Sequence, residues 1–207
     1  MNKRMLAALG ISTAMASALS LASEAGPVAQ RQAASALAAK NCAQCHDAPP
    51  GTGSQLVPVL AGQQQAYLAW QLRAYKLGFR DDPQAHQNML SPALALNETL
   101  MDALAEYYAS KPPVPGRPTD GASMSRGQNL YNGVGLINNQ TACAACHGAD
   151  AAGNGIFPRL AGQKAEYLIR QVSLIKENLR NVGIMHSTVQ KLSEDDIKAV
   201  ATYLQSR

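Results

Sequence analysis

Apolar residues recur along this chain with the spacing of amphipathic α-helices. One pattern, at i, i+4, i+7 and i+11, is seen twice, at Leu68, Leu72, Tyr75 and Phe79 and at Leu168, Val172, Ile175 and Leu179. A second pattern, at i, i+3, i+4 and i+7, comprises Met101, Leu104, Ala105 and Tyr108, and later Ile197, Val200, Ala201 and Leu204. Such spacing places the apolar side chains on one helix face. Asn97 and Ser193 stand where they predict the N-caps of the last two helices.

A third kind of helix is predicted at the start of each half. Residues 30–40 are rich in alanine, and residues 125–131 open the second half. No run of residues has the alternation of a β-strand, so the predicted fold class is all-α. The first half has no counterpart of Gly127 and Tyr131, which the second half carries in its opening helix.

The chain is an internal duplication. The segment Leu60-Ala61-Gly62-Gln63 returns as Leu160-Ala161-Gly162-Gln163, with Pro58 and Pro158 at the same distance before it. Such self-similarity predicts two homologous domains, which we place at 26–111 and 122–207. The connection 112–121 contains four prolines and no apolar periodicity, so we expect an extended, semi-rigid linker.

The N-terminus has the pattern of a secretory signal peptide. Lys3 and Arg4 precede an apolar run from Met5 to Leu21, and small residues follow. The run is shorter than the ~20 residues of a membrane-spanning helix, so cleavage is favoured over retention as an anchor. Cleavage after Ala22 or after Ala25 satisfies the rule for small residues, and we take 1–25 as the signal peptide. The mature protein is then expected to be soluble in the periplasm.

The net charge of the chain does not indicate a particular class of partner. The formal net charge of the chain is +4, and removal of the signal peptide lowers it. No cluster of lysine and arginine suggests nucleic-acid binding.

All four cysteines lie in two copies of the motif Cys-x-x-Cys-His. The copies are Cys42-Ala43-Gln44-Cys45-His46 and Cys143-Ala144-Ala145-Cys146-His147. This spacing lets two thiols form thioethers with the vinyl groups of one porphyrin while the adjoining histidine ligates the iron. We therefore predict two covalently bound c-type haems. Each would also supply buried apolar surface to a helical domain that is small and poor in aromatic residues.

Three other interpretations of the cysteines fit the motif less well. A shared zinc ion would require the two distant pairs to converge and leaves both histidines unexplained. A redox dithiol normally follows a β-strand, and none is predicted here. Structural disulfides give no reason for a histidine after each pair.

Methionine is the favoured sixth ligand of each iron. Met89 and Met185 align between the halves at an offset of 96, each on a loop before the terminal helix, whereas Met101 falls on the apolar face of that helix. His86 and His186 lie beside the two methionines but do not align with each other. Bis-histidine ligation therefore stays open as the less favoured alternative.

These residues resemble a known family, the di-haem class I c-type cytochromes, and in particular the cytochrome c4 family. The resemblance is carried by the two haem motifs, the Pro-x-Leu-Ala-Gly-Gln segments, the methionine segments and the run Leu192 to Ile197. It implies that the carbonyl groups of Pro58 and Pro158 accept hydrogen bonds from the proximal histidines. It also implies haem propionates near the domain interface, where two tyrosines and two arginines could contact them, namely Tyr67, Tyr167, Arg80 and Arg180.

The resemblance implies an electron carrier and not an enzyme, since both axial positions of each iron are filled. The expected partners are a cytochrome bc complex or similar donor and a terminal oxidase as acceptor, with transient association with membrane-bound complexes. Two alternatives remain: the electron-accepting haem subunit of a periplasmic dehydrogenase, and a di-haem peroxidase. The second is disfavoured by the methionine in each half.

Overall fold

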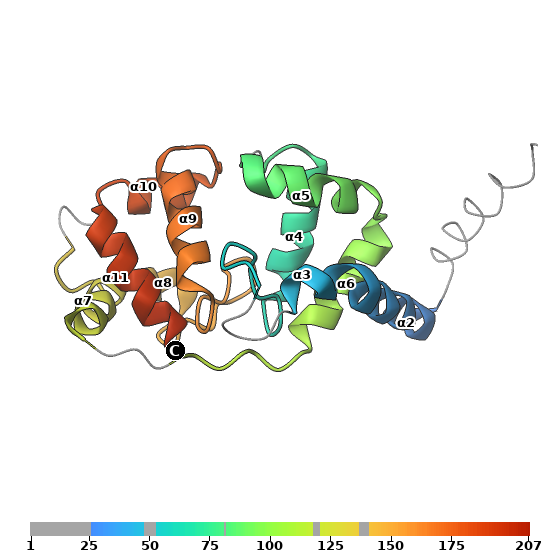
Figure 1. Ribbon diagram of the computed structural model, residues 1–207, viewed down its shortest axis with the longest axis horizontal. Coiled ribbons are helices and arrows are strands. Elements are labelled where there is room, and N and C mark those ends of the chain that lie inside the picture. The colour runs from blue at the N-terminus through green and yellow to red at the C-terminus, as the bar shows by residue number, and fades with distance from the viewer. Residues whose placement is uncertain (1–25, 48–52, 81, 118–120, 137–140) are drawn as a thin grey trace, which may run out of the picture.

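The computed structural model describes residues 26–47, 53–80, 82–117, 121–136 and 141–207, so the predicted signal peptide lies outside the described residues. Within these ranges the fold is all-α, as predicted, and the one β feature is an isolated bridge between Asn154 and Phe157. Two helical halves lie side by side, and the linker runs along one edge of both (Figure 1). None of the helices in these ranges has the length and apolar character to cross a bilayer.

Each half contains an opening helix, a short helix at the haem motif, and three further helices. In the first half these are α2 (Pro27–Leu37), a π-helical turn (Ala38–Cys42), α3 (Ala43–His46), α4 (Gln65–Lys76), α5 (Pro83–Leu94) and α6 (Glu98–Ala109). In the second half they are α7 (Ala122–Tyr131), α8 (Cys143–His147), α9 (Ala165–Lys176), α10 (Gly183–Val189) and α11 (Glu194–Gln205).

The terminal helices α6 and α11 follow the sequence prediction closely. The Asn97 side chain accepts a hydrogen bond from the Leu100 amide, and Ser193 forms a capping box with Asp196. Both devices satisfy amide groups that the first helical turn leaves without partners. All eight residues of the two predicted apolar stripes are buried.

The stripes of α4 and α9 end sooner than the periodicity predicted. Both helices stop at a lysine, and the chain then turns through Gly78 and Asn178, whose φ angles are 74° and 59°. That left-handed conformation ends a helix and is adopted most easily by glycine and asparagine. Phe79 and Leu179 therefore leave the apolar face and are exposed, so their predicted place in the core is wrong.

The opening and terminal helices of each half cross at small residues. A Cβ atom on Gly127 would lie 2.1 Å from the Ala199 carbonyl oxygen of α11, so that α7 can approach α11 closely only with glycine there. In the first half α2 packs against α6, and the fully buried Ala34 of α2 belongs to the same core cluster as the buried residues of α6.

A tyrosine in each half packs beside the first cysteine of the motif, but it comes from a different helix. In the second half it is Tyr131 of α7, whose ring lies 5.7 Å from that of Tyr203. In the first half the ring is Tyr108 of α6, 5.1 Å from Tyr107. The first half thus places a tyrosine ring beside its first cysteine without a counterpart of Tyr131 in its opening helix.

The linker is fixed to both halves. A Cβ on Gly62, with φ 69°, would lie 2.6 Å from Pro113, and one on Gly162, with φ 75°, would lie 2.4 Å from the Val114 carbonyl oxygen. The Arg117 amide also donates to the Gln205 carbonyl at 2.9 Å. The two glycines of the repeated segment are thus needed for their backbone conformation and for this close approach.

Candidate functional site

The two motifs are held on helical turns. In the first domain α2 passes through the π-helical turn directly into the motif, so that Cys42 ends that turn and His46 ends α3. In the second domain a longer connection separates α7 from α8, which consists of the five motif residues.

Each motif histidine is fixed by the carbonyl group that the family resemblance implied. The Nδ1 atoms of His46 and His147 lie 2.9 Å from the carbonyl oxygens of Pro58 and Pro158. A carbonyl oxygen can only accept, so Nδ1 must carry the proton in both rings. The Nε2 lone pair of each ring is therefore available to a metal ion.

The surroundings of both histidines suit iron ligation. Burial lowers the pKa of each imidazole below its ordinary value, which keeps the ring neutral at physiological pH. Among the described residues Nε2 of His147, which is buried, has no hydrogen-bond partner. A buried polar atom without a partner is costly, and an iron ion at this position would remove the cost.

The cysteines fit thioether attachment better than the other interpretations. All four are free thiols, and the described residues contain no group of three or more potential metal ligands. Burial raises the pKa of Cys143 to about 11 and also raises that of Cys42. A redox-active dithiol needs a thiol with a lowered pKa, so this environment argues against dithiol exchange.

The methionines lie on helices and not on the loops that the sequence predicted. Met89 is in α5 and Met185 is in α10, and both side chains are half-buried. As sixth ligands, both methionines stay predictions. His186 is otherwise engaged, because its Nδ1 lies 2.7 Å from the Ile175 carbonyl oxygen and its Nε2 lies 2.6 Å from the Gln190 amide nitrogen.

A pair of glutamines joins the two domains at their proximal loops, which are the segments that contain Pro58 and Pro158. The Gln63 side chain binds both the amide and the carbonyl of Arg159, at 2.6 and 2.9 Å. The Gln163 side chain binds the amide and carbonyl of Val59, at 2.9 and 3.0 Å. Val59 and Arg159 directly follow the prolines that fix the histidines, so each domain braces the proximal loop of the other. The repetition of this glutamine was visible in the sequence, but its role was not.

A buried polar cluster forms a second part of the interface. Gln71 and Gln171 each accept hydrogen bonds from both Arg80 and Arg180, at 2.7–3.1 Å. The Tyr67 hydroxyl lies 3.0 Å from Arg180. The structure thus brings together three of the four residues that the resemblance placed near the propionates, and Tyr167 is close enough to interact with the same arginines.

The charges in this cluster are not symmetric. Asp82, which is 2 % exposed, pairs with Arg80 at 2.9 Å, and the equivalent position before α10 is Val182. Arg180 therefore has no carboxylate partner among the described residues, and its Nε atom has no hydrogen-bond partner there. An anionic group such as a propionate would suit it.

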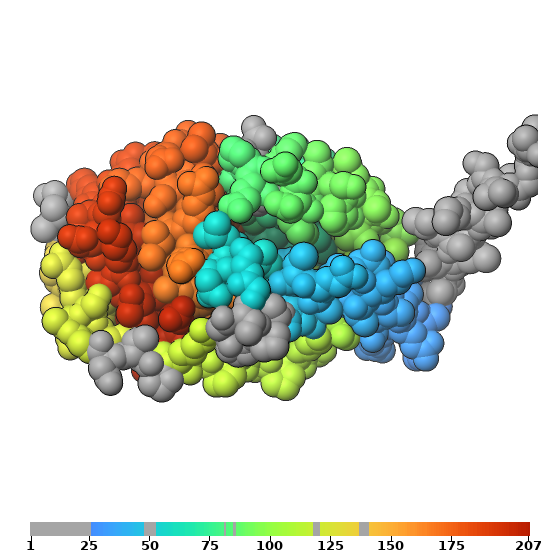
Figure 2. All heavy atoms as spheres, in the orientation of Figure 1, coloured from blue at the N-terminus to red at the C-terminus, as the bar shows by residue number. Residues whose placement is uncertain are grey.

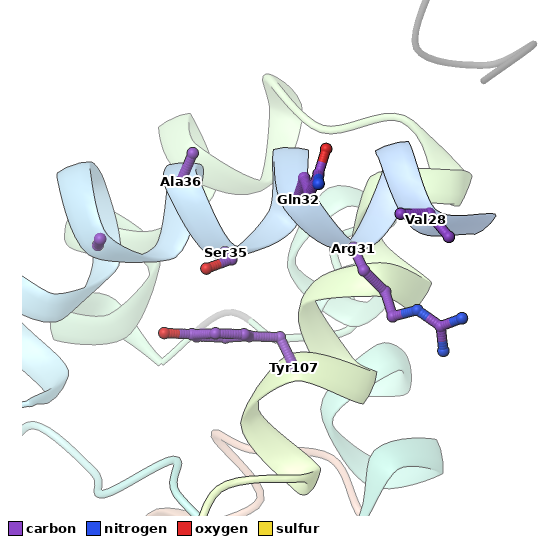
Figure 3. A pocket seen from close by; sticks show the side chains of 7 residues that line it. Val28, Arg31, Gln32, Ser35, Ala36 and Tyr107 are labelled. Atoms are coloured by element: carbon purple, nitrogen blue, oxygen red, sulfur yellow. The ribbon is translucent and has the colours of Figure 1, made fainter. Parts of the chain in front are cut away.

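The surface of the molecule shows how closely the halves meet. Residues that follow Gly53 lie against the second domain at the junction (Figure 2). A separate shallow groove runs along α2, where Tyr107 lies opposite Ser35 and Arg31 (Figure 3). This groove contains none of the predicted ligands.

Comparison with known proteins agrees with this geometry. A family model described as cytochrome c matches residues 32–110 and 125–207. Cytochrome c4 of Azotobacter vinelandii is 32% identical over 196 residues, which cover 89% of this chain and 91% of the relative. The solved structure of cytochrome c4 from Acidithiobacillus ferrooxidans has a TM-score of 0.75 and 35% identity, and the match covers 80% of this chain and 98% of that one.

A relative with a more specific name is also similar. The thiosulfate dehydrogenase electron acceptor of Thiomonas intermedia is 33% identical over 178 residues, which cover 82% of this chain and 79% of the relative. This relative is named as an electron acceptor.

Proposed function

Because this chain belongs to the cytochrome c family, within its di-haem cytochrome c4 branch, we propose that it carries electrons in the periplasm from a cytochrome bc complex or similar donor to a terminal oxidase. Two covalent c-type haems supply the redox chemistry. The chain itself attaches them, fixes their ligands and holds the two domains in contact.

The reciprocal brace made by Gln63 and Gln163 is the observation that carries this proposal. Each proximal histidine is hydrogen-bonded to a proline carbonyl, and the next residue is clamped by the other domain. The two metal sites are therefore fixed relative to each other. Such an arrangement favours electron exchange within the molecule, since little reorganisation of the protein is required.

We assign the attachment residues as Cys42, Cys45, Cys143 and Cys146, and the axial ligands as His46, Met89, His147 and Met185. We also retain 26–111 and 122–207 as the domain boundaries. With both axial positions filled, neither iron would offer a site for substrate, which suits a carrier better than a peroxidase.

A second candidate function is that of an electron-accepting subunit of a periplasmic dehydrogenase. The similarity to the thiosulfate dehydrogenase electron acceptor favours it. The two functions share the same chemistry and differ in whether the partner is bound transiently or permanently.

Stopped-flow mixing of the haem-loaded protein with a quinol-oxidising bc complex and with a periplasm-facing oxidase tests the proposed function. We expect fast, salt-sensitive reduction by the first and oxidation by the second, because docking of a mobile carrier is steered by charge. Isolation of the protein only in a tight complex with a dehydrogenase would support the second candidate. Rapid turnover of peroxide would contradict both.

The attachment residues give a separate prediction. Replacing Cys42 and Cys45 together by alanine should reduce the mass of the matured protein by one haem, because the first domain then has no thiol for a thioether. Replacing Cys143 and Cys146 should remove one haem from the second domain in the same way. Mass spectrometry of the two variants checks this, and a single pair whose loss removes both haems would contradict independent attachment.

A further inference from the structure

The residue just before α4 and the residue just before α9 occupy equivalent places. Gln64 and Lys164 are the N-caps of these helices, with almost the same backbone angles, φ −62° and ψ 127° or 128°. Each directly follows the glutamine that braces the opposite domain. Each side chain also crosses the interface to a carbonyl oxygen in the loop behind the other domain's histidine. Gln64 donates to Ala152 at 2.9 Å, and Lys164 donates to Ser54 at 2.9 Å.

The two side chains differ in charge. Gln64 is neutral, whereas Lys164 brings an ammonium group to the loop that follows His46. Lys164 is only 4 % exposed, and no carboxylate forms an ion pair with it in the part of the chain that the structure describes. A charge in that position is weakly screened by solvent.

Lys164 lies beside the segment that holds the proximal histidine of the first domain. It directly follows Gln163, whose side chain binds the amide and carbonyl of Val59. The carbonyl of the preceding residue, Pro58, accepts the hydrogen bond from Nδ1 of His46. The ammonium group of Lys164 is therefore held close to the first iron site, whereas Gln64 brings no charge to the second.

We infer that Lys164, a residue of the second domain, is an electrostatic tuning residue of the first haem. A positive charge near an iron ion favours the ferrous state, because the ferric state carries one more positive charge. The second haem faces Gln64 and lacks this contribution. The inference rests on the proposed function, since it takes His46 as the ligand of a redox-active iron.

Exchange of the two residues tests this inference on the haem-loaded protein. Lys164→Gln gives the first domain the neutral side chain that the second domain has, and Gln64→Lys does the reverse. We expect Lys164→Gln to lower the potential of the first haem by about 59 mV, which corresponds to about a tenfold change in the one-electron equilibrium constant. Gln64→Lys should raise the potential of the second haem by a similar factor. Spectropotentiometric titration measures both, and the two steps are assigned with a Met89→His variant in each background.

Lys164→Arg serves as the matched control, because it keeps the charge and can still donate to the Ser54 carbonyl. A tuning role predicts that this variant retains the potential of the parent protein, and that the shift in Lys164→Gln persists at high salt. Equal shifts at both haems, no shift at either, or the same shift in Lys164→Arg as in Lys164→Gln would overturn the inference.

The haem count and the visible spectrum of the same samples keep this result separate from the proposed function. A parent protein with two haems and unchanged ligands, but no effect of the exchange, contradicts the tuning role alone. A parent protein that lacks one haem contradicts the proposed function itself.

Discussion

Replacing Met89 by histidine should lower the potential of the first haem by on the order of 0.1–0.3 V. Axial ligands set the redox potentials of haem proteins over a range of ~0.8 V. The thioether favours the ferrous state more than imidazole does. The weak far-red band of a methionine-to-ferric-iron bond should disappear from that domain and persist in the other. Met185→His should have the mirror effect on the second haem.

Met101 offers a matched control for this experiment. It is in the same domain but fully buried in α6, and its replacement by leucine conserves volume, so that the cost in stability is below about 1.5 kcal/mol. The far-red band and both potentials should be unchanged in Met101→Leu. If the band keeps its full intensity in Met89→His, the assignment of Met89 as the sixth ligand is wrong.

Asp82→Asn should reduce the free energy of unfolding by about 3 kcal/mol, because removing one partner of a buried ion pair leaves an uncompensated charge. We expect a large effect because the cluster contains two arginines, Arg80 and Arg180. Asp82 is the only carboxylate among the described members of the cluster. Guanidinium-induced unfolding of the haem-loaded protein measures it.

Glu98→Gln is the appropriate comparison. Glu98 pairs with Arg73 at 2.7 Å, but its side chain is 62 % exposed, and a pair of that kind contributes at most about 1 kcal/mol. Equal losses of stability in the two variants would show that the buried pair has no special part in holding the domains together.

The sequence predicted those parts of the fold that depend on local patterns. The stripes and N-caps of α6 and α11 agree with the structure because apolar periodicity and Asn97 or Ser193 act within one helix. The histidine-to-proline contacts were implied by the family resemblance and are present. The attachment motifs needed no tertiary information, since their chemistry lies within five residues.

The parts that the sequence did not predict depend on contacts between distant segments. The segments around Met89 and Met185 are helical although they were expected to be loops. In α5, Pro92 lies within the helix, and Asp82 at its N-cap position turns its carboxylate to Arg80 and does not cap it. The tyrosine beside the first cysteine comes from α6 in the first half and from α7 in the second, which only the packing of the helices shows. The partners of Gln63 and Gln163 were likewise not predictable, although the repetition of this glutamine was visible in the sequence.

Redox titration of the haem-loaded protein, followed through the far-red band, tests the central claim most directly. Two irons with histidine and methionine ligands predict two one-electron steps, with the band present in the fully oxidised protein and lost stepwise as each iron is reduced. A single redox step accounting for one haem, or an oxidised protein without the band, would contradict the account.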